Sequence, residues 1–297
     1  MTELKIFPND FLELIKEDLK DLFHKDEISN AETLNKKFAF AKKQEPSYFA
    51  GKFNAKTVFV MLNPGGKALD NYSFAEKEKK KYSNSEHFFT EYMNKHINGG
   101  EDAFKRYQNG ATLDNFDLKQ AAFLYDFKES EIFLPDFFSV SDKEPRQTRQ
   151  MAIRNVLMNK LQLELIPYCS AQFNVNVNVN VKENIDIFLP HIKRILDAIV
   201  SYDRKYVIFG SRKFYDLLKA YNNREQNTEI EFLVNNCYVK IEGLDKRVSY
   251  SIVKITYNDK TFHAIIANTF PRRDLPNAYE KMRCYGKLCW EELIKYM

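Results

Sequence analysis

Residues 58–66 constrain the fold of this chain more than any other segment. They read V-F-V-M-L-N-P-G-G, in which five consecutive apolar residues precede an Asn-Pro-Gly-Gly turn. An apolar run of this length, bounded by residues that turn the backbone, is typical of a strand buried on both faces of a sheet. Because helices must cover both faces of such a sheet, the segment favours an α/β fold.

The turn after this strand is also a candidate ligand site. Asn63 carries an amide that both donates and accepts hydrogen bonds, and Gly65 and Gly66 lack a Cβ, so a ligand can approach their backbone closely. In open α/β sheets, ligands bind beyond the carboxyl ends of the strands, where this turn would lie. An ordinary strand-to-helix turn capped by Asn63 is the alternative, and the local sequence leaves both interpretations open.

The rest of the chain alternates between predicted strands and helices. Strands are predicted in segments 161–170, 206–209, 250–257 and 261–268, the last two as a hairpin around 258–260. Helices are predicted around 11–23 and at 30–42, 147–158, 185–200, 214–221 and 279–297. This alternation indicates a single doubly wound α/β domain over 1–297, with an N-terminal helical segment at 1–50 and a helical insertion at about 67–115.

Composition narrows the class of protein. A chain of 297 residues that is 44% hydrophobic can bury one large core or two modest ones. Its start does not resemble a signal peptide, and no apolar run approaches the length of a membrane span. The four cysteines form no CxxC pair and the five histidines are scattered, which argues against disulfides and a metal site. We therefore expect a soluble cytoplasmic monomer that has no metal and no organic cofactor.

Charge gives little evidence about partners. The net charge of +4 does not by itself indicate nucleic-acid binding. Basic residues gather in three segments, at 77–81, 143–154 and 272–287. Each segment is more often a solvated helix face than a track for phosphates.

The order of the turns resembles that of a known enzyme superfamily. The turns that follow the predicted strands are, in order, Asn63-Pro64-Gly65-Gly66, Pro167-Tyr168-Cys169-Ser170, Gly210-Ser211 and Phe270-Pro271-Arg272-Arg273, and a terminal helix follows the last. This order is similar to the uracil-DNA glycosylase superfamily, whose first strand ends in Asp-Pro or Asn-Pro-Gly and whose last strand ends in a His-Pro-Ser-type loop. The resemblance covers 48–297. Its most specific part, 62–65, is similar to the thymine/uracil mismatch branch, and segments 48–51 and 167–170 are similar to a poorly characterised bacterial branch.

The resemblance implies a fold, an activity and a set of site residues. The fold would be a three-layer α/β/α structure with a short, mainly parallel central sheet. The activity would be hydrolysis of the N-glycosidic bond of a damaged or mismatched base flipped out of DNA. Asn63 would be the catalytic residue that positions the water. The substrate pocket would comprise Leu62, Pro64, Gly65, Gly66, Tyr168, Ser170 and Phe270, and the DNA phosphates would meet Gly210, Ser211, Arg272 and Arg273.

Two departures from the family pattern keep other functions open. Phe270 stands where the family has a histidine, and the second strand lacks the family's base-reading asparagine, so that Glu164 and Tyr168 are the nearest polar side chains. A non-catalytic module that binds nucleic acid or nucleotides is therefore the main alternative, and an unrelated small-molecule hydrolase is a third. The family interpretation predicts that Asn63, Phe270 and Arg272 surround one cleft at the carboxyl edge of a parallel sheet.

Overall fold

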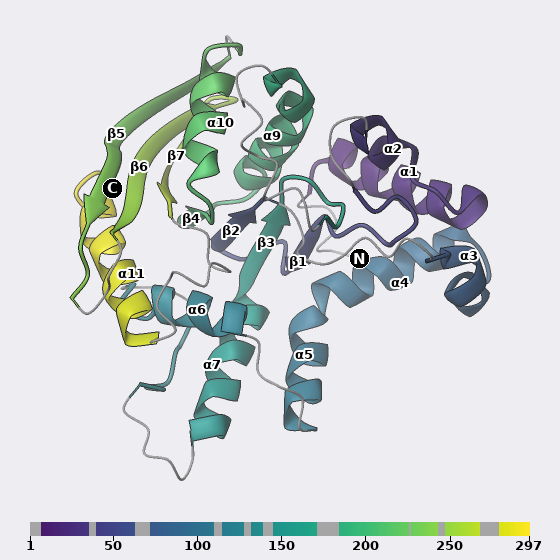
Figure 1. Ribbon diagram of the computed structural model, residues 1–297, viewed down its shortest axis with the longest axis horizontal. Helices are drawn as coiled ribbons and strands as arrows, with labels where there is room; N and C mark the ends of the chain where they lie inside the picture. The colour runs from purple at the N-terminus through teal and green to yellow at the C-terminus, as the bar shows by residue number, and fades with distance from the viewer. Residues whose placement is uncertain are drawn as a thin grey trace.

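The centre of the molecule is a mixed β-sheet. The computed structural model describes residues 7–35, 40–62, 72–109, 115–127, 132–138, 145–170, 184–225, 227–242, 247–267 and 279–297. Within these ranges the strands are β1 (Phe49–Gly51), β2 (Thr57–Met61), β3 (Lys160–Glu164), β4 (Tyr206–Phe209), β5 (Thr228–Val239), β6 (Val248–Tyr257) and β7 (Lys260–Ile266). They form a seven-stranded sheet in the order β1-β3-β2-β4-β7-β6-β5 (Figure 1).

Only the middle of this sheet is parallel. β3, β2, β4 and β7 run in one direction, whereas β1 is antiparallel to β3, and β6 is antiparallel to both of its neighbours, β5 and β7. The expectation of a mainly parallel sheet is therefore wrong. Two strands that the sequence analysis did not predict, the edge strand β1 and the long strand β5, add antiparallel pairs to the sheet.

The predicted β-hairpin is confirmed. β6 and β7 pair in antiparallel register from Tyr257 and Lys260 outward, across a turn formed by Asn258 and Asp259. Both turn residues have positive φ, 48° and 61°. Asn and Asp tolerate this left-handed conformation better than other non-glycine residues, and two-residue hairpin turns with positive φ match the twist of the strands.

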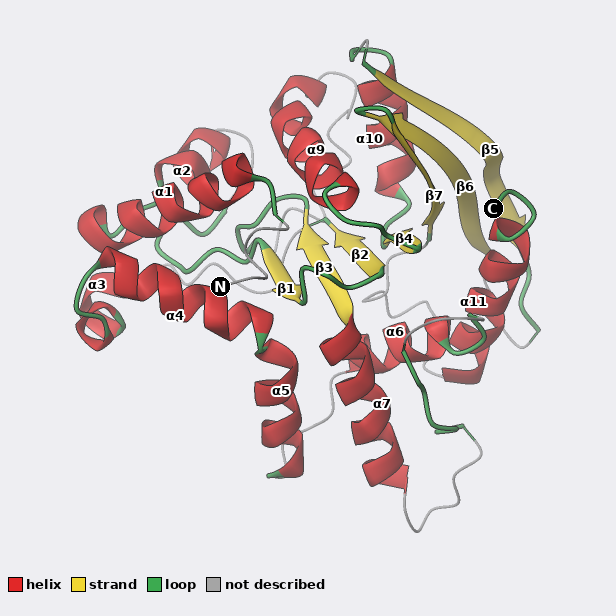
Figure 2. Ribbon diagram, turned by 180° about the vertical axis from the view of Figure 1, so that it is seen from behind, coloured by secondary structure: helices red, strands yellow, loops and turns green. Residues whose placement is uncertain are grey.

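Helices lie on both faces of the sheet (Figure 2). One face carries α1 (Asn9–Lys25), α2 (Ser29–Asn35), α4 (Ser85–Ile97), α9 (Ile185–Val200) and α10 (Lys213–Asn222), and the other carries α6 (Asn115–Leu124), α7 (Pro145–Asn159) and α11 (Tyr279–Leu293). Three further helical elements are α3 (Phe74–Lys77), the 3₁₀ turn η2 (Lys79–Lys81) and α5 (Gly99–Gln108). The chain is thus an α/β protein with helices above and below a mixed sheet.

Most predicted helices are confirmed, and one is shorter than expected. α9 has the predicted bounds, and α1 buries the predicted stripe that includes Phe11, Ile15 and Leu19. The helix predicted at 30–42 corresponds to α2, which ends at Asn35. Near its predicted end, the Ala41 N–H donates to the carbonyl of Cys169 instead of a helical partner, at 2.9 Å.

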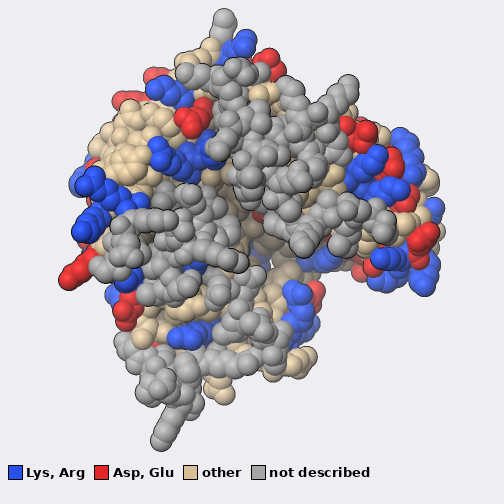
Figure 3. Space-filling model, in the orientation of Figure 1, with Lys and Arg blue, Asp and Glu red and all other residues tan. Residues whose placement is uncertain are grey.

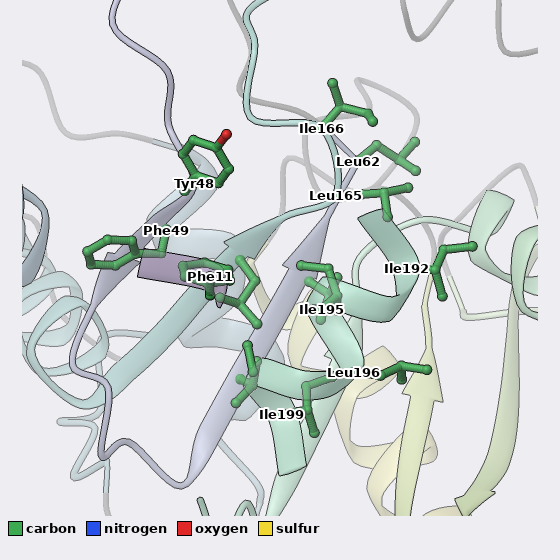
Figure 4. Packing of buried hydrophobic residues seen from close by; sticks show 14 of the residues in the cluster. Phe11, Tyr48, Phe49, Leu62, Leu165, Ile166, Ile192, Ile195, Leu196 and Ile199 are labelled. Carbon is green, nitrogen blue, oxygen red and sulfur yellow. The ribbon is translucent and has the colours of Figure 1, made fainter. Parts of the chain in front are cut away.

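Alternating side chains of the strands divide the interior into two cores. Val58, Val60 and Leu163 pack with α1, α4, α9 and α10, whereas Phe59 and Met61 pack with α6, α7 and α11. In the first core, Figure 4 shows Leu62, Leu165 and Ile166 from the strand ends beside Ile192, Ile195, Leu196 and Ile199 of α9. Burial of each such aliphatic side chain contributes about 1.5–3 kcal/mol, so this packing fixes where the parallel strands end.

None of the helices within the described ranges has the length and apolar character needed to cross a bilayer.

Candidate functional site at the carboxyl edge of the sheet

Four parallel strands end at one level. The Leu165 N–H donates to the carbonyl of Met61, and the Gly210 N–H donates to that of Val60, each at 2.8 Å. On the far side of β4, the Ala267 N–H donates to the carbonyl of Phe209 at 2.9 Å. These bonds align the carboxyl ends of β3, β2, β4 and β7, so the segments that leave them start side by side.

The strand order places a topological switch point at this edge. Among the four parallel strands β2 comes first along the chain, and the next two, β3 and β4, lie on its opposite sides. Connections that leave in opposite directions open a crevice beyond the carboxyl ends of the strands, where ligands of open α/β sheets bind. By this rule a ligand is expected between the end of β2, at Leu62, and the end of β4, at Gly210.

Many of the predicted site residues lie outside the described residues. These are Asn63, Pro64, Gly65, Gly66, Phe270, Arg272 and Arg273. Leu62 and Ala267, the last described residues before the two segments that contain them, end at the same edge of the sheet. The common cleft of Asn63, Phe270 and Arg272 stays a prediction.

Among the predicted pocket residues that the structure describes, three are buried. Leu62 packs in the core beneath α9, and its carbonyl accepts the Ile166 N–H at 2.9 Å (Figure 4). The Tyr168 hydroxyl donates to Asp18 Oδ2 at 2.8 Å. Ser170 is also buried. Leu62 and Tyr168 thus take part in the packing that supports the edge of the sheet, and their contact with a substrate stays a prediction.

Gly210 and Ser211 lead directly into a helix. The Ser211 carbonyl accepts the Phe214 N–H, and the Ser211 hydroxyl accepts the Lys213 N–H. The turn therefore places the N-terminus of α10 just beyond the end of β4, at the switch point. The helix dipole favours an anion near such an N-terminus, and the resemblance implies a phosphate contact at this turn.

Glu164 was not among the predicted site residues, although it is the last residue of β3. Its side chain faces the α6 side of the sheet and is only 3% exposed. Its Oε1 accepts a hydrogen bond from Gln162 Nε2 at 2.8 Å, whereas its Oε2 is buried and has no hydrogen-bond partner among the described residues. A buried polar atom of this kind at a ligand-binding edge is a candidate contact for a ligand.

The environment of Glu164 favours its neutral form. Burial raises its pKa to about 8, against the smaller opposing effects of the Gln162 hydrogen bond and of the charges on Lys160 and Arg194. At neutral pH the side chain is therefore largely a carboxylic acid, which can donate a hydrogen bond as well as accept one. A neutral acid held by burial is a known means of stabilising negative charge that develops on a substrate.

The sequence contains a signal for this residue. Lys160, Gln162 and Glu164 alternate with Leu161 and Leu163 in a strand that is otherwise apolar. A strand covered on both faces normally lacks such an alternation, so polar residues at every second position indicate a buried polar network on one face.

A second buried network holds the opposite side of the strand end. The Asp18 carboxylate on α1 accepts hydrogen bonds from the hydroxyls of Tyr48 and Tyr168, at 2.6 and 2.8 Å, and from the amide of Asn30, at 2.8 Å. Burial, the dominant effect, raises the pKa of Asp18 despite these bonds. The helical stripe of α1 predicts the apolar residues around Asp18 but gives no sign of its partners.

Arg194 connects α9 to the same strand end. Its Nη2 donates to the carbonyls of Glu164 and Leu165, at 2.8 and 2.7 Å, and its guanidinium lies over the ring of Tyr48. The arginine thereby holds the backbone at the point where the chain leaves β3. Glu164 is consequently fixed at its main chain by α9 and at its side chain by Gln162.

The described basic residues do not form an unbroken phosphate track. Arg283 makes a two-pronged ion pair with Asp126, at 2.8 and 3.0 Å, and Arg154 pairs with Glu101 at 3.2 Å. Around α3 and α4, Figure 3 shows Lys and Arg interspersed with Asp and Glu. Arg283 and Arg154 are thus partly neutralised within the protein, which makes them weaker candidates for phosphate contacts.

Within the ranges that the structure describes, no group of three or more His, Cys, Asp or Glu side chains could hold a metal ion. Comparison with models of known protein families, with curated proteins and with solved structures finds no match to this chain.

Proposed function

We propose that the protein is a hydrolase of the uracil-DNA glycosylase type, a cytoplasmic monomer that removes a damaged or mismatched base from DNA. Two lines of reasoning support this proposal. The order of the strand-end turns resembles that superfamily, and the switch point lies between the strands that lead to Asn63 and to Gly210. The observation that carries the proposal is Glu164, a buried neutral acid with a free oxygen at this edge.

Glu164 would supply a group that the reaction needs. When the N-glycosidic bond breaks, the base departs with negative charge and needs a hydrogen-bond donor. Phe270, which stands where the family has a histidine, cannot donate. Glu164, as a neutral acid, would donate from Oε2 and stabilise the departing base.

The other groups would position the reactants. Asn63 would hold the attacking water through its side-chain carbonyl, without taking its proton, and Gly65 would leave room for a bulky base. Arg272, Arg273 and the N-terminus of α10 would meet the phosphates that flank the flipped nucleotide. No step in this scheme requires a metal or an organic cofactor.

The test is an excision assay on oligonucleotides that carry uracil, hypoxanthine or a thymine mismatch. Wild-type protein should release at least one of these bases. Asn63→Ala should lower the rate on the order of 100-fold or more, because loss of one positioning group has an effect of that size. The same preparation should melt nearly as the wild type does, since loss of a capping bond costs only about 1 kcal/mol.

Asn84→Ala is the matched control for this substitution. Asn84 caps α4 by accepting the His87 N–H at 2.8 Å, and it is not one of the proposed site residues. The Asn84→Ala protein should lose about as much stability as Asn63→Ala does and should excise the base at the wild-type rate. Equal excision by wild type and Asn63→Ala would make Asn63 an ordinary turn residue.

A non-catalytic module that binds nucleic acid or nucleotides is the second candidate. The observation that favours it is Phe270, because the familiar donor to the departing base is replaced by a side chain that cannot donate. Binding to the same oligonucleotides without release of any base would support this candidate. Release of a base would exclude it.

A further inference from the structure

A continuous chain of polar side chains runs through the core to Glu164. On one face of β3 lie Lys160, Gln162 and Glu164, and opposite them on α6 lie Asp117 and Gln120. Lys160 is almost fully buried, and its ammonium donates to Asp117 Oδ1 at 3.4 Å, to Gln162 Oε1 at 3.1 Å and to Gln120 Oε1. The chain continues from Gln162 to Glu164.

Lys160 determines which way the glutamine amides point. An ammonium group can only donate hydrogen bonds, so each amide near it must present its oxygen. Gln162 therefore directs Oε1 toward Lys160, and the Gln120 amide reinforces this orientation by donating to the same oxygen at 3.3 Å. The Nε2 of Gln162 is left to face Glu164.

This orientation determines how the Glu164 carboxyl is used. Because Gln162 Nε2 donates to Oε1, a proton on that oxygen would face another donor. The proton of the neutral acid therefore belongs on Oε2, the oxygen without a partner among the described residues. Oε2 thus acts as a donor.

The charged groups around Glu164 do not alter this assignment. Lys160 on β3 and Arg194 on α9 both act on the carboxyl, but Lys160 is also paired with Asp117 of α6, and the nearest contact of Arg194 is with backbone carbonyls. A further titratable neighbour is the Cys169 thiol, whose pKa is raised by burial and by Glu164. Burial outweighs both cations, and the acid stays neutral near pH 7.

We propose that Lys160 is a positioning residue that, through Gln162, makes Glu164 Oε2 a hydrogen-bond donor, so that the site takes a ligand offering a carbonyl acceptor there. A ligand with an amino group at that point would bring two donors together and leave both unsatisfied. The choice of base rests on the function proposed above, whereas the arrangement of the polar chain does not.

The polar chain is tested first without any ligand, by following the carboxyl ¹³C signal of Glu164 against pH. Gln162→Met removes the donor to Oε1 and leaves the ion pair of Lys160 in place. Because the ionised form then loses a hydrogen bond, the pKa of Glu164 should rise by about one unit relative to wild type. Lys160→Met combined with Asp117→Asn should also raise it, since the Gln162 amide can then turn away.

Gln150→Met is the matched control for these variants. Gln150 is a buried glutamine on α7 that donates to the carbonyl of Tyr107 at 2.9 Å, outside the polar chain. Its loss should leave the Glu164 titration unchanged. An unchanged titration in Gln162→Met as well would overturn the proposal.

The ligand class is tested with single-stranded oligonucleotides that carry one uracil or one cytosine. At C4 uracil offers a carbonyl acceptor and cytosine an amino donor, and the neighbouring N3 changes from a donor to an acceptor. Wild type should bind the uracil strand roughly tenfold more tightly, the factor expected for one misplaced hydrogen bond. Glu164→Gln should keep this preference at every pH, because its amide would place NH₂ at the Oε2 position. Glu164→Gln combined with Gln162→Glu should reverse it, since the new carboxylate attracts that NH₂.

The two experiments separate the inference from the proposed function. Absence of binding to both strands, together with the expected titration shifts, would contradict the glycosylase function and leave the polar chain established. Binding with equal affinity for both strands would overturn the ligand class. Retention of the uracil preference in the double variant would show that Gln162 does not set the direction of the hydrogen bond.

Discussion

At the scale of single residues, buried polar groups control how the protein responds to pH. Glu164 has a pKa near 4.5 when exposed and about 8 in the folded protein. The folded state therefore holds a proton that the unfolded chain releases. The resulting stabilisation is complete below pH 4.5 and is lost as the pH rises toward 8.

We predict that Glu164→Gln removes this dependence. Between pH 5 and pH 8 the free energy of unfolding of the wild type should fall, relative to the variant, on the order of a few kcal/mol, since each unit of pKa difference corresponds to about 1.4 kcal/mol. Urea unfolding of both proteins at several pH values measures the difference. Parallel curves for the two proteins would show that Glu164 titrates normally.

Tyr168 illustrates a residue whose role depends on its partner. The resemblance implies a contact with the substrate, yet its hydroxyl donates to Asp18 in a buried network. The sequence reveals the tyrosine, but it cannot reveal a partner that lies on a helix at the other end of the chain. Residue roles of this kind depend on tertiary contacts, which local patterns do not encode.

We predict that Tyr168→Phe affects stability and not excision. Loss of the hydroxyl leaves Asp18 with fewer donors and should lower the free energy of unfolding by about 1–3 kcal/mol. The rate of base release per folded molecule should stay at the wild-type level. A lower rate of base release by Tyr168→Phe with an unchanged melting temperature would show that Tyr168 contacts the substrate.

At the scale of elements, the sequence predicts those that carry a strong pattern of their own. The bounds of α9 and β4 agree with the sequence prediction because an amphipathic helix and a four-residue apolar strand are locally evident. β1, β5 and α6 were missed. β1 has only three residues, and β5 alternates between buried and exposed residues only over its first four positions, before two irregularities in its pairing.

The contact between α6 and α11 depends on a glycine. A Cβ on Gly286 would lie 1.9 Å from the carbonyl oxygen of Phe123, a backbone atom that cannot rotate away. The two helices therefore approach more closely than any larger residue would allow. Gly99, at the start of α5, has nothing within 4 Å of the same position.

We predict opposite outcomes for alanine at these two glycines. Gly286→Ala should lower the free energy of unfolding by at least about 1–3 kcal/mol, because α11 must move away from α6. Gly99→Ala should be neutral or slightly stabilising, by up to about 1 kcal/mol, since it only restricts the unfolded chain. Thermal melts of the two variants provide the comparison, and equal losses would mean that helix spacing does not depend on Gly286.

At the scale of the whole molecule, the distribution of charge limits which residues can bind DNA. Arg283 belongs to a basic segment of the sequence, but its Nε and Nη2 both donate to the carboxylate of Asp126. Arg272 and Arg273 lie outside the described residues and stay predicted phosphate contacts. The sequence could identify the basic segments, but only the structure shows which of their members are already paired.

We predict that these arginines differ in the salt dependence of DNA binding. Changing both Arg272 and Arg273 to Ala should weaken binding and reduce the slope of log K against log salt by roughly one to two, since each phosphate contact releases about one counterion. Arg283→Ala should leave the slope unchanged. Fluorescence anisotropy at a series of salt concentrations measures all three proteins, and a reduced slope for Arg283→Ala alone would reverse the assignment.

The position of β2 between β3 and β4 has a consequence for folding during translation. β2 is among the first strands to leave the ribosome, yet its neighbours begin only at Lys160 and Tyr206. At about 5–20 residues per second, translation leaves this strand unpaired for several seconds or more. Nascent chains halted before β4 should therefore expose an apolar edge that chaperones recognise, and the speed of synthesis should influence the yield of folded protein.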